Sequence, residues 1–186
     1  MRLTLRQLKK IIAENVQGCK QPHYFGSAGA GFIFLCKDDQ TIYLQKRNTR
    51  GGIGQWGFPG GGFSPKILGF IPYERFFDTP IDEKHRFKPD DPAFMKNAQR
   101  EVVEETGSMP EHQLIDTHIY EDCGFIYKTF IANMTAKEKS NWEPRIDSEN
   151  LDHGWYPISE FLKMDLFFGF TQPLISRVLK NVKAKH

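Results

Sequence analysis

The chain has 186 residues, which suits one domain with a sizeable core. Its apolar fraction of 39% and charged fraction of 26% are ordinary for a soluble globular protein, and a net charge of +2 gives no general reason to expect a nucleic-acid binder. No apolar run is long enough for a transmembrane helix, and three widely spaced cysteines argue against a disulfide framework or zinc site, so we expect a cytoplasmic protein.

Residues 4–16 carry apolar side chains at helical spacing, with Lys9 and Lys10 on the other side. We expect an amphipathic accessory helix packed on the protein rather than a helix bound to a membrane surface. A Gly- and Pro-containing linker follows. The predicted organisation is residues 1–20 as this helix and its linker, and residues 21–186 as the main domain.

Two strand-like segments, 27–36 and 41–47, are joined by a polar turn and predict a hairpin. Small residues at 28–31 would let another backbone or a ligand approach closely. A loop at 48–54 leads to the glycine run that begins at Gly60.

The next stretch, about 63–90, interleaves basic and aromatic residues. We expect it to act mainly as a lid or a packing segment. A clamp for a polyphosphate or a nucleic-acid end, and a contact between two copies of the chain, are the alternatives.

Three acids follow, because Glu101, Glu104 and Glu105 are spaced i, i+3 and i+4. In a helix they share one face and repel one another, and Arg100 is placed to pair with Glu104. A hard divalent cation, Mg²⁺ or Mn²⁺, would turn that repulsion into binding. The alternative is a solvated acidic helix face.

The helix that carries these acids is predicted to span about 92–106. Asp91 is expected to be its N-cap, ahead of Pro92, and Gly107 its left-handed C-cap.

Later segments predict a second strand pair, at 115–122 and 125–135, and a charged loop at 136–148. A short strand should end at Pro157, followed by a short helix at 159–162 and a last helix from about 172 to 182. Strands on both sides of one helix favour an α/β fold with a mixed sheet covered on both faces.

The run Arg-Glu-Val-Val-Glu-Glu-Thr-Gly at 100–107 resembles the second half of the Nudix box, G-x5-E-x7-R-E-U-x-E-E-x-G-U. Two more segments fit that family in the expected order: Gly54-Gln55-Trp56-Gly57-Phe58-Pro59-Gly60-Gly61 before the box, and 149–161 after it. The resemblance spans about 27–162 and implies a Nudix-type α/β/α sandwich.

The chain departs from the family pattern between Gly61 and Arg100, which are about 25 residues farther apart than the box allows. The position of the first box glutamate is taken by Pro92, and the sequence does not decide whether Glu74, Asp90 or Asp91 replaces it.

The resemblance also implies the site. Glu101, Glu104 and Glu105 would hold Mg²⁺, with Mn²⁺ as an alternative. Glu104 and Glu149 are the expected catalytic residues, Glu149 as a base or an extra ligand. Arg47, Gly60 and Gly61 would bind substrate phosphate, and Arg100 would give structural support. Ordinary structural roles for Glu149, as a surface acid, and for Arg47, in an ion pair, remain open.

The implied function is a metal-dependent pyrophosphohydrolase that cleaves the diphosphate linkage of a nucleoside diphosphate joined to another moiety. A catalytically weak nucleotide sensor and an RNA 5′-end processing enzyme are the alternatives. The expected partner is a nucleotide-type small molecule; RNA is less favoured, a membrane is not expected, and a homodimer is left open.

Overall fold

The computed structural model describes residues 28–49, 52–63, 90–122, 125–167 and 169–183. The predicted helix at 4–16 and nearly all of the inserted stretch lie outside the described residues. The division into residues 1–20 and 21–186 therefore stays a prediction.

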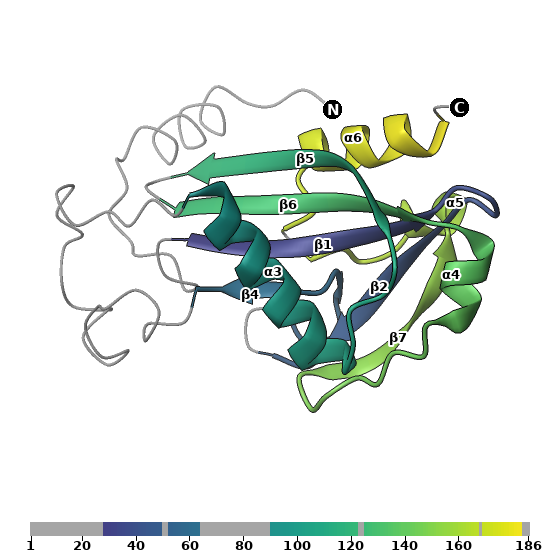
Figure 1. Cartoon of the computed structure of the whole chain (residues 1–186), viewed down its shortest axis with the longest axis horizontal. Helices are drawn as coiled ribbons and strands as arrows, with labels where there is room; N and C mark the ends of the chain where they lie inside the picture. Colours follow the sequence, from purple (N-terminus) through teal and green to yellow (C-terminus); the bar gives the residue numbers. More distant parts are fainter. Residues whose placement is uncertain (1–27, 50–51, 64–89, 123–124, 168, 184–186) are drawn as a thin grey trace, which may run out of the picture.

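A sheet forms the middle layer of the described part of the chain (Figure 1). Its seven strands are β1 (Ala28–Cys36), β2 (Thr41–Arg47), β3 (Trp56–Gly57), β4 (Gly60–Gly62), β5 (Gln113–Asp122), β6 (Phe125–Met134) and β7 (Asn150–Pro157).

The sheet is mixed, as predicted. Strand order is β3-β2-β1-β6-β5, while β4 also pairs with β1 and β7 with β2. The β1–β6 pair is parallel and runs in register from Ala28 opposite Ile126 to Cys36 opposite Met134, and the other pairs are antiparallel. The predicted hairpin of β1 and β2 is confirmed.

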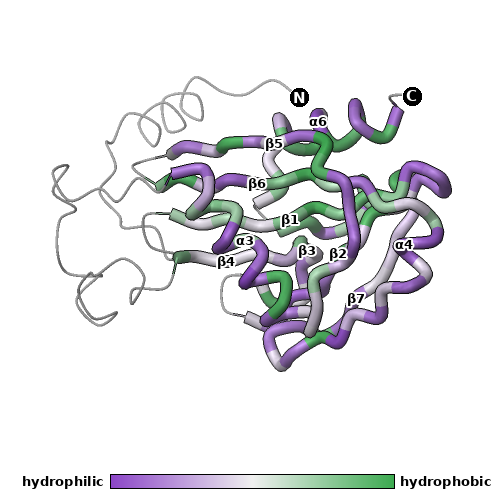
Figure 2. Tube along the Cα trace, viewed as in Figure 1, coloured by the Kyte–Doolittle hydropathy of each residue, from purple (hydrophilic) through white to green (hydrophobic). Residues whose placement is uncertain are grey.

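Residues of β1 alternate between two cores because successive strand side chains point to opposite faces. Phe32 and Phe34 pack with helix α3 (Asp91–Thr106), whereas Ile33 and Leu35 pack with α5 (Ile158–Phe161) and α6 (Gln172–Lys183). Figure 2 shows hydrophobic residues on this central strand and hydrophilic residues on the helix α4 (Ala136–Asn141) at the rim. The sheet is therefore covered on both faces, in agreement with the predicted sandwich.

Helix α3 begins one residue earlier than predicted, so the expectation that Asp91 is its N-cap is wrong. The Oδ1 of Asp90 accepts the N–H of Ala93 at 2.9 Å, and Asp91 lies inside the first turn, where its carboxylate pairs with Lys128. Gly107 is the left-handed C-cap that was predicted, with φ of 81°.

The prediction of a loop across 136–148 is also wrong, because this stretch opens with α4. Thr135 and Glu138 form a capping box, in which each side chain accepts the other residue's backbone N–H. Trp142, directly after the helix, is buried against Phe34 and Tyr43. The helix is a local feature that a charge-based interpretation missed.

Among the described residues, no helix is long and apolar enough to cross a membrane.

Candidate active site

Strand β4 forms the floor of the candidate site, and it is built of glycine. Gly60, Gly61 and Gly62 pair with Gly31, Ala30 and Gly29 of β1, so small residues meet on both strands. A Cβ at position 61 would lie 2.5 Å from Oε2 of Glu101. The expected close approach at 28–31 is thus made by this strand, and the space beside Gly61 is filled by a carboxylate.

Two of the three predicted acids of α3 lie against β4. The Oε2 of Glu105 accepts the backbone N–H of Gly60 at 3.3 Å, and Glu105 is buried. Glu101 reaches Gly61 from one helical turn earlier, and its side chain is 13% exposed. The i,i+4 spacing therefore places Glu101 and Glu105 on the same face of α3, as the sequence predicted.

The third acid, Glu104, is turned further toward solvent, with 56% of its side chain exposed. Arg100 joins it to the site, because its guanidinium pairs with both Glu104 and Glu101. The same guanidinium donates to Oδ1 of Asn97 at 3.0 Å. The predicted Arg100–Glu104 pair is present, and Arg100 bridges two of the acids.

Burial raises the pKa of Glu101 to about 7, and the negative charges of Glu104 and Glu149 act in the same direction, while Arg100 opposes them. Burial also raises the pKa of Glu105 well above its ordinary value, helped by Glu101 and opposed by Arg47. Buried carboxylates that repel one another are characteristic of sites that bind a cation or move a proton.

Arg47 ends β2 and brings a positive charge to the same place. Its guanidinium lies over the ring of Phe167, with Cζ 4.1 Å from the ring centre, and donates to Oγ1 of Thr49 at 2.8 Å. The Nε of Arg47 is buried and has no hydrogen-bond partner among the described residues. An unpaired buried donor on a cation is a natural contact for an anionic oxygen.

Glu149 lies in the loop before β7, which is tied to the end of β2. The carbonyl oxygen of Glu149 accepts the N–H of Asn48 at 2.7 Å, and its own N–H is bonded to Oδ1 of Asp147 at 2.9 Å. The loop is close enough for Glu149 to act on the pKa of Glu101, and Asp147 on that of Glu105.

No group of three or more His, Cys, Asp or Glu side chains converges closely enough to hold a metal ion within the described ranges. The donor set nevertheless fits a hard divalent cation. It consists of carboxylate oxygens, one of which fills the space beside Gly61, and their charges are only partly balanced by Arg47 and Arg100. The positive group that lies between Glu101 and Glu104 is the guanidinium of Arg100, which pairs with both carboxylates.

Of the candidates to replace the missing first box glutamate, Asp90 is the N-cap and Asp91 pairs with buried Lys128; Glu74 lies outside the described residues. Trp56 and Trp155 pack on the two cores.

Sequence reasoning missed Phe167 and Asn97, the neighbours of the two arginines. Nothing in the sequence marks Phe167, whose contact with Arg47 joins segments far apart in the chain. Asn97 could have been found from its position one turn before Glu101, on the face of the helix that meets β4.

A family model, the NUDIX domain, matches residues 27–176 of this chain. Solved structures with a similar fold include a Nudix hydrolase from M. smegmatis, RenU, with a TM-score of 0.55 and 17% identity over 86% of this chain and 88% of that one. The NUDIX domain of Shewanella oneidensis NrtR, in complex with ADP-ribose, has a TM-score of 0.54 and 18% identity over 84% and 88% of the two chains.

A C. elegans Ap4A hydrolase binary complex has a TM-score of 0.52 and 15% identity over 83% of this chain and 94% of that one. No curated protein matches the chain in sequence. At these identities the structural likeness concerns the fold alone.

Proposed function

Since the chain belongs to the Nudix hydrolase family, we propose that it is a Mg²⁺- or Mn²⁺-dependent pyrophosphohydrolase that cleaves the diphosphate linkage of a nucleoside diphosphate joined to another moiety. The NUDIX domain of NrtR was solved with ADP-ribose, and another similar structure is an Ap4A hydrolase. Both names concern nucleotides that contain phosphoric anhydrides, which fits the proposed substrate class.

One observation carries the proposal. Buried acids of α3 and the unpaired Nε of Arg47 meet at a strand that has no side chains at Gly60 and Gly61. Because neither glycine carries a side chain, the carboxylates of Glu101 and Glu105 can lie directly against the backbone of this strand.

Glu101, Glu104 and Glu105 would hold the metal ion. A bound Mg²⁺ or Mn²⁺ supplies positive charge to the phosphates and lowers the pKa of a water molecule. Arg47 binds a phosphate oxygen through its free N–H, and Arg100 keeps Glu101 and Glu104 in place.

Glu149 is the proposed base, with Glu104 as the second catalytic residue. Glu149 accepts the proton of the attacking water as its oxygen bonds to one phosphorus. The bond from that phosphorus to the bridging oxygen breaks, and the electron pair leaves with the second phosphate group.

A release assay across substrate classes tests this function. ADP-ribose, a dinucleoside polyphosphate, a nucleotide sugar, deoxynucleoside triphosphates and a capped RNA are each incubated with Mg²⁺ or Mn²⁺, and with EDTA as control. We expect release from at least one of them, abolished by EDTA. Tight nucleotide binding in calorimetry without any release would contradict the proposal and indicate a sensor instead.

A further inference from the structure

Strand β7 has one extra residue relative to β2, at the end that lies beside the candidate site. The two strands pair regularly as far as Lys46 opposite Asp152, but the next pair is Arg47 opposite Asn150. Leu151 is therefore the extra residue of a β-bulge. Bulges bend a strand and redirect the side chains next to them, and they recur beside active sites.

The bulge determines which residue at the start of β7 lies beside Asn48. With the bulge, the backbone N–H of Asn48 donates to the carbonyl oxygen of Glu149 at 2.7 Å. In a regular ladder the partner would be Asn150, because the pairing of Lys46 with Asp152 would continue without a shift. A shift of one residue reverses the face to which each side chain points. The bulge therefore brings Glu149, rather than its neighbour, to the end of β2.

Glu149 belongs to a turn that is fixed from two sides. From within the turn, Oδ1 of Asp147 accepts the N–H of Glu149 at 2.9 Å and the side-chain N–H of Asn150 at 3.2 Å. From β2, the side-chain N–H of Asn48 donates to the carbonyl oxygen of Ser148 at 3.0 Å, beside the backbone bond to Glu149. One asparagine thus holds two successive carbonyl oxygens of the turn.

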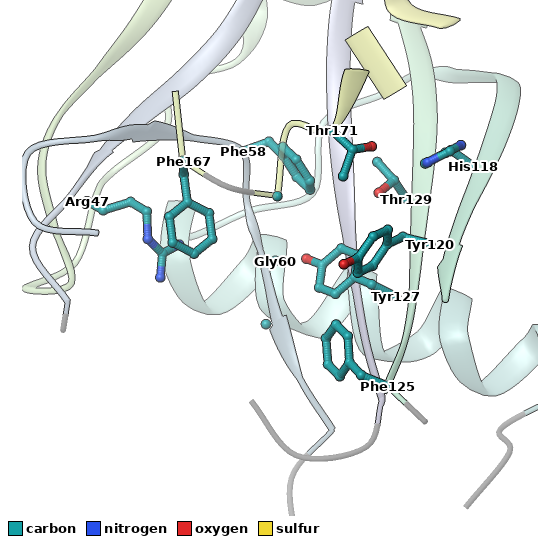
Figure 3. Close-up of a pocket in the computed structure, with 12 residues that line it drawn as sticks. Arg47, Phe58, Gly60, His118, Tyr120, Phe125, Tyr127, Thr129, Phe167 and Thr171 are labelled. Carbon is teal, nitrogen blue, oxygen red and sulfur yellow. The ribbon is translucent and has the colours of Figure 1, made fainter. Parts of the chain in front are cut away.

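The residue before Asn48 is Arg47, whose guanidinium lies over the ring of Phe167 (Figure 3). The end of β2 therefore carries a group of the candidate site and, directly after it, the link to the turn. The turn is close to the acids of α3, because the negative charge of Glu149 adds to burial in raising the pKa of Glu101. Any shift of the turn would move Glu149 relative to those acids.

We propose that Asn48 is a positioning residue, which holds Glu149 at the acids of α3 through its two hydrogen bonds to the turn. The inference rests on the proposed function, in which Glu149 is the base. It gives Asn48 no contact with substrate or metal. Loss of its side chain should therefore lower turnover through the displacement of Glu149 and leave substrate binding by Arg47 intact.

Steady-state kinetics of Asn48→Ala, on the substrate cleaved fastest in the release assay, tests the assignment. We expect kcat to fall at least about tenfold, because small displacements of a catalytic group are costly, and KM to change less than about twofold. Asn48→His should recover most of the turnover, since Nδ1 of its imidazole can donate from nearly the same position. Loss of substrate affinity alone, with kcat unchanged, would contradict the assignment.

Ser140→Ala is the control for these variants. It removes another exposed hydrogen bond from a side chain to a carbonyl oxygen, that of Lys137, at a place outside the candidate site. It should change neither kcat nor KM. A loss of kcat equal to that of Asn48→Ala would show a general effect on the fold and would overturn the inference.

A double-mutant cycle shows whether Asn48 acts through Glu149. In the Glu149→Gln background, Asn48→Ala should change the residual kcat by less than about twofold, because the group that it positions is already gone. An equal loss in both backgrounds would overturn the inference. Full turnover in Glu149→Gln would also overturn it, and would leave a hydrolase that uses another base.

Hydrogen exchange followed by NMR tests the two hydrogen bonds without turnover. In Asn48→Ala the backbone amides at positions 48 and 149 should exchange about fivefold faster, as expected for one lost hydrogen bond, while amides of β1 keep their rates. Unchanged exchange at both positions would overturn the inference even in an active enzyme. No release from any substrate, with the faster exchange still present, would instead remove the proposed function and leave the two hydrogen bonds in place.

Discussion

Gly61 shows how closely single residues set the geometry of the candidate site. In Gly61→Ala the new Cβ would lie 2.5 Å from the Glu101 carboxylate, which is the end of a flexible side chain and can move aside. We expect the fold to survive and turnover to fall about tenfold or more, because small displacements of catalytic groups are costly. Phosphate release measures the fall in turnover, and thermal unfolding of the same variant checks that the fold survives.

Gly154→Ala serves as the control for that change, because its Cβ would make only ordinary contact, 3.4 Å from the ring of Tyr156. It should leave both turnover and the melting temperature nearly unchanged. If Gly61→Ala kept full activity, the position of Glu101 beside β4 would be irrelevant to the reaction.

At this scale the sequence predicted the acids and the glycines but not their surroundings. Glu101, Glu104, Glu105 and the glycines of β4 belong to short local patterns. The contact of Arg47 with Phe167, and the meeting of Phe58 with Tyr127, depend on how distant segments pack. No spacing rule encodes such contacts, so they could not be predicted from the sequence.

The N-cap of helix α3 can be tested by substitution, because the Asp90 side chain forms it. Asp90→Ala removes the side chain that accepts the N–H of Ala93, so we expect a loss of about 1 kcal/mol in the free energy of unfolding. Asp90→Asn should cost much less, since asparagine is an equally good N-cap. Urea unfolding of both variants measures these losses. Equal losses of unfolding free energy in the two variants would mean that the cap is not formed in solution.

A second prediction at this scale concerns α6, whose side chains form hydrogen bonds with Asp116 of β5. Its carboxylate accepts from Arg177 at 2.7 Å and from Asn181 at 2.8 Å. Partial burial alone would raise the pKa of Asp116, but these bonds and the N–H of Thr117 outweigh it, and the pKa is lowered. Asp116→Asn should therefore cost on the order of 1 kcal/mol at pH 7.

The pH dependence of that loss has a definite sign. Because the folded pKa of Asp116 is depressed, its contribution is fully present above the ordinary pKa of an aspartate, about 4, and is lost as the pH falls through the folded value. The difference from wild type should shrink in unfolding curves below pH 4. Glu121→Gln, an exposed acid on the same strand, is the control, and a loss independent of pH would contradict the assignment.

Most elements were predictable because their signals are local. The strand-like apolar runs of β1 and β2, the Gly107 cap and the periodicity of α6 all depend on neighbours within a few residues. The helix at Ala136–Asn141 was missed although its capping box is equally local, because the charged composition was given more weight than the Thr135–Glu138 spacing. Asp90 and Asp91 are adjacent acids, and sequence alone does not choose between them.

At the scale of the whole molecule, the sheet joins segments that lie far apart in the chain. The parallel pairing of β1 with β6 joins residues that are almost a hundred positions apart. Composition and periodicity do not fix such a pairing, and the expected topology came from the family resemblance.

The measurement closest to the central claim is Mn²⁺ binding by calorimetry, paired with phosphate release, in Glu105→Gln. Glutamine keeps an oxygen for the N–H of Gly60, so the fold should persist, while removal of one charge should weaken Mn²⁺ binding. Turnover should fall roughly a hundredfold or more. Exposed Glu143, changed to Gln, should alter neither quantity. Wild-type Mn²⁺ affinity and turnover in Glu105→Gln would contradict the assignment of the α3 acids as the metal site.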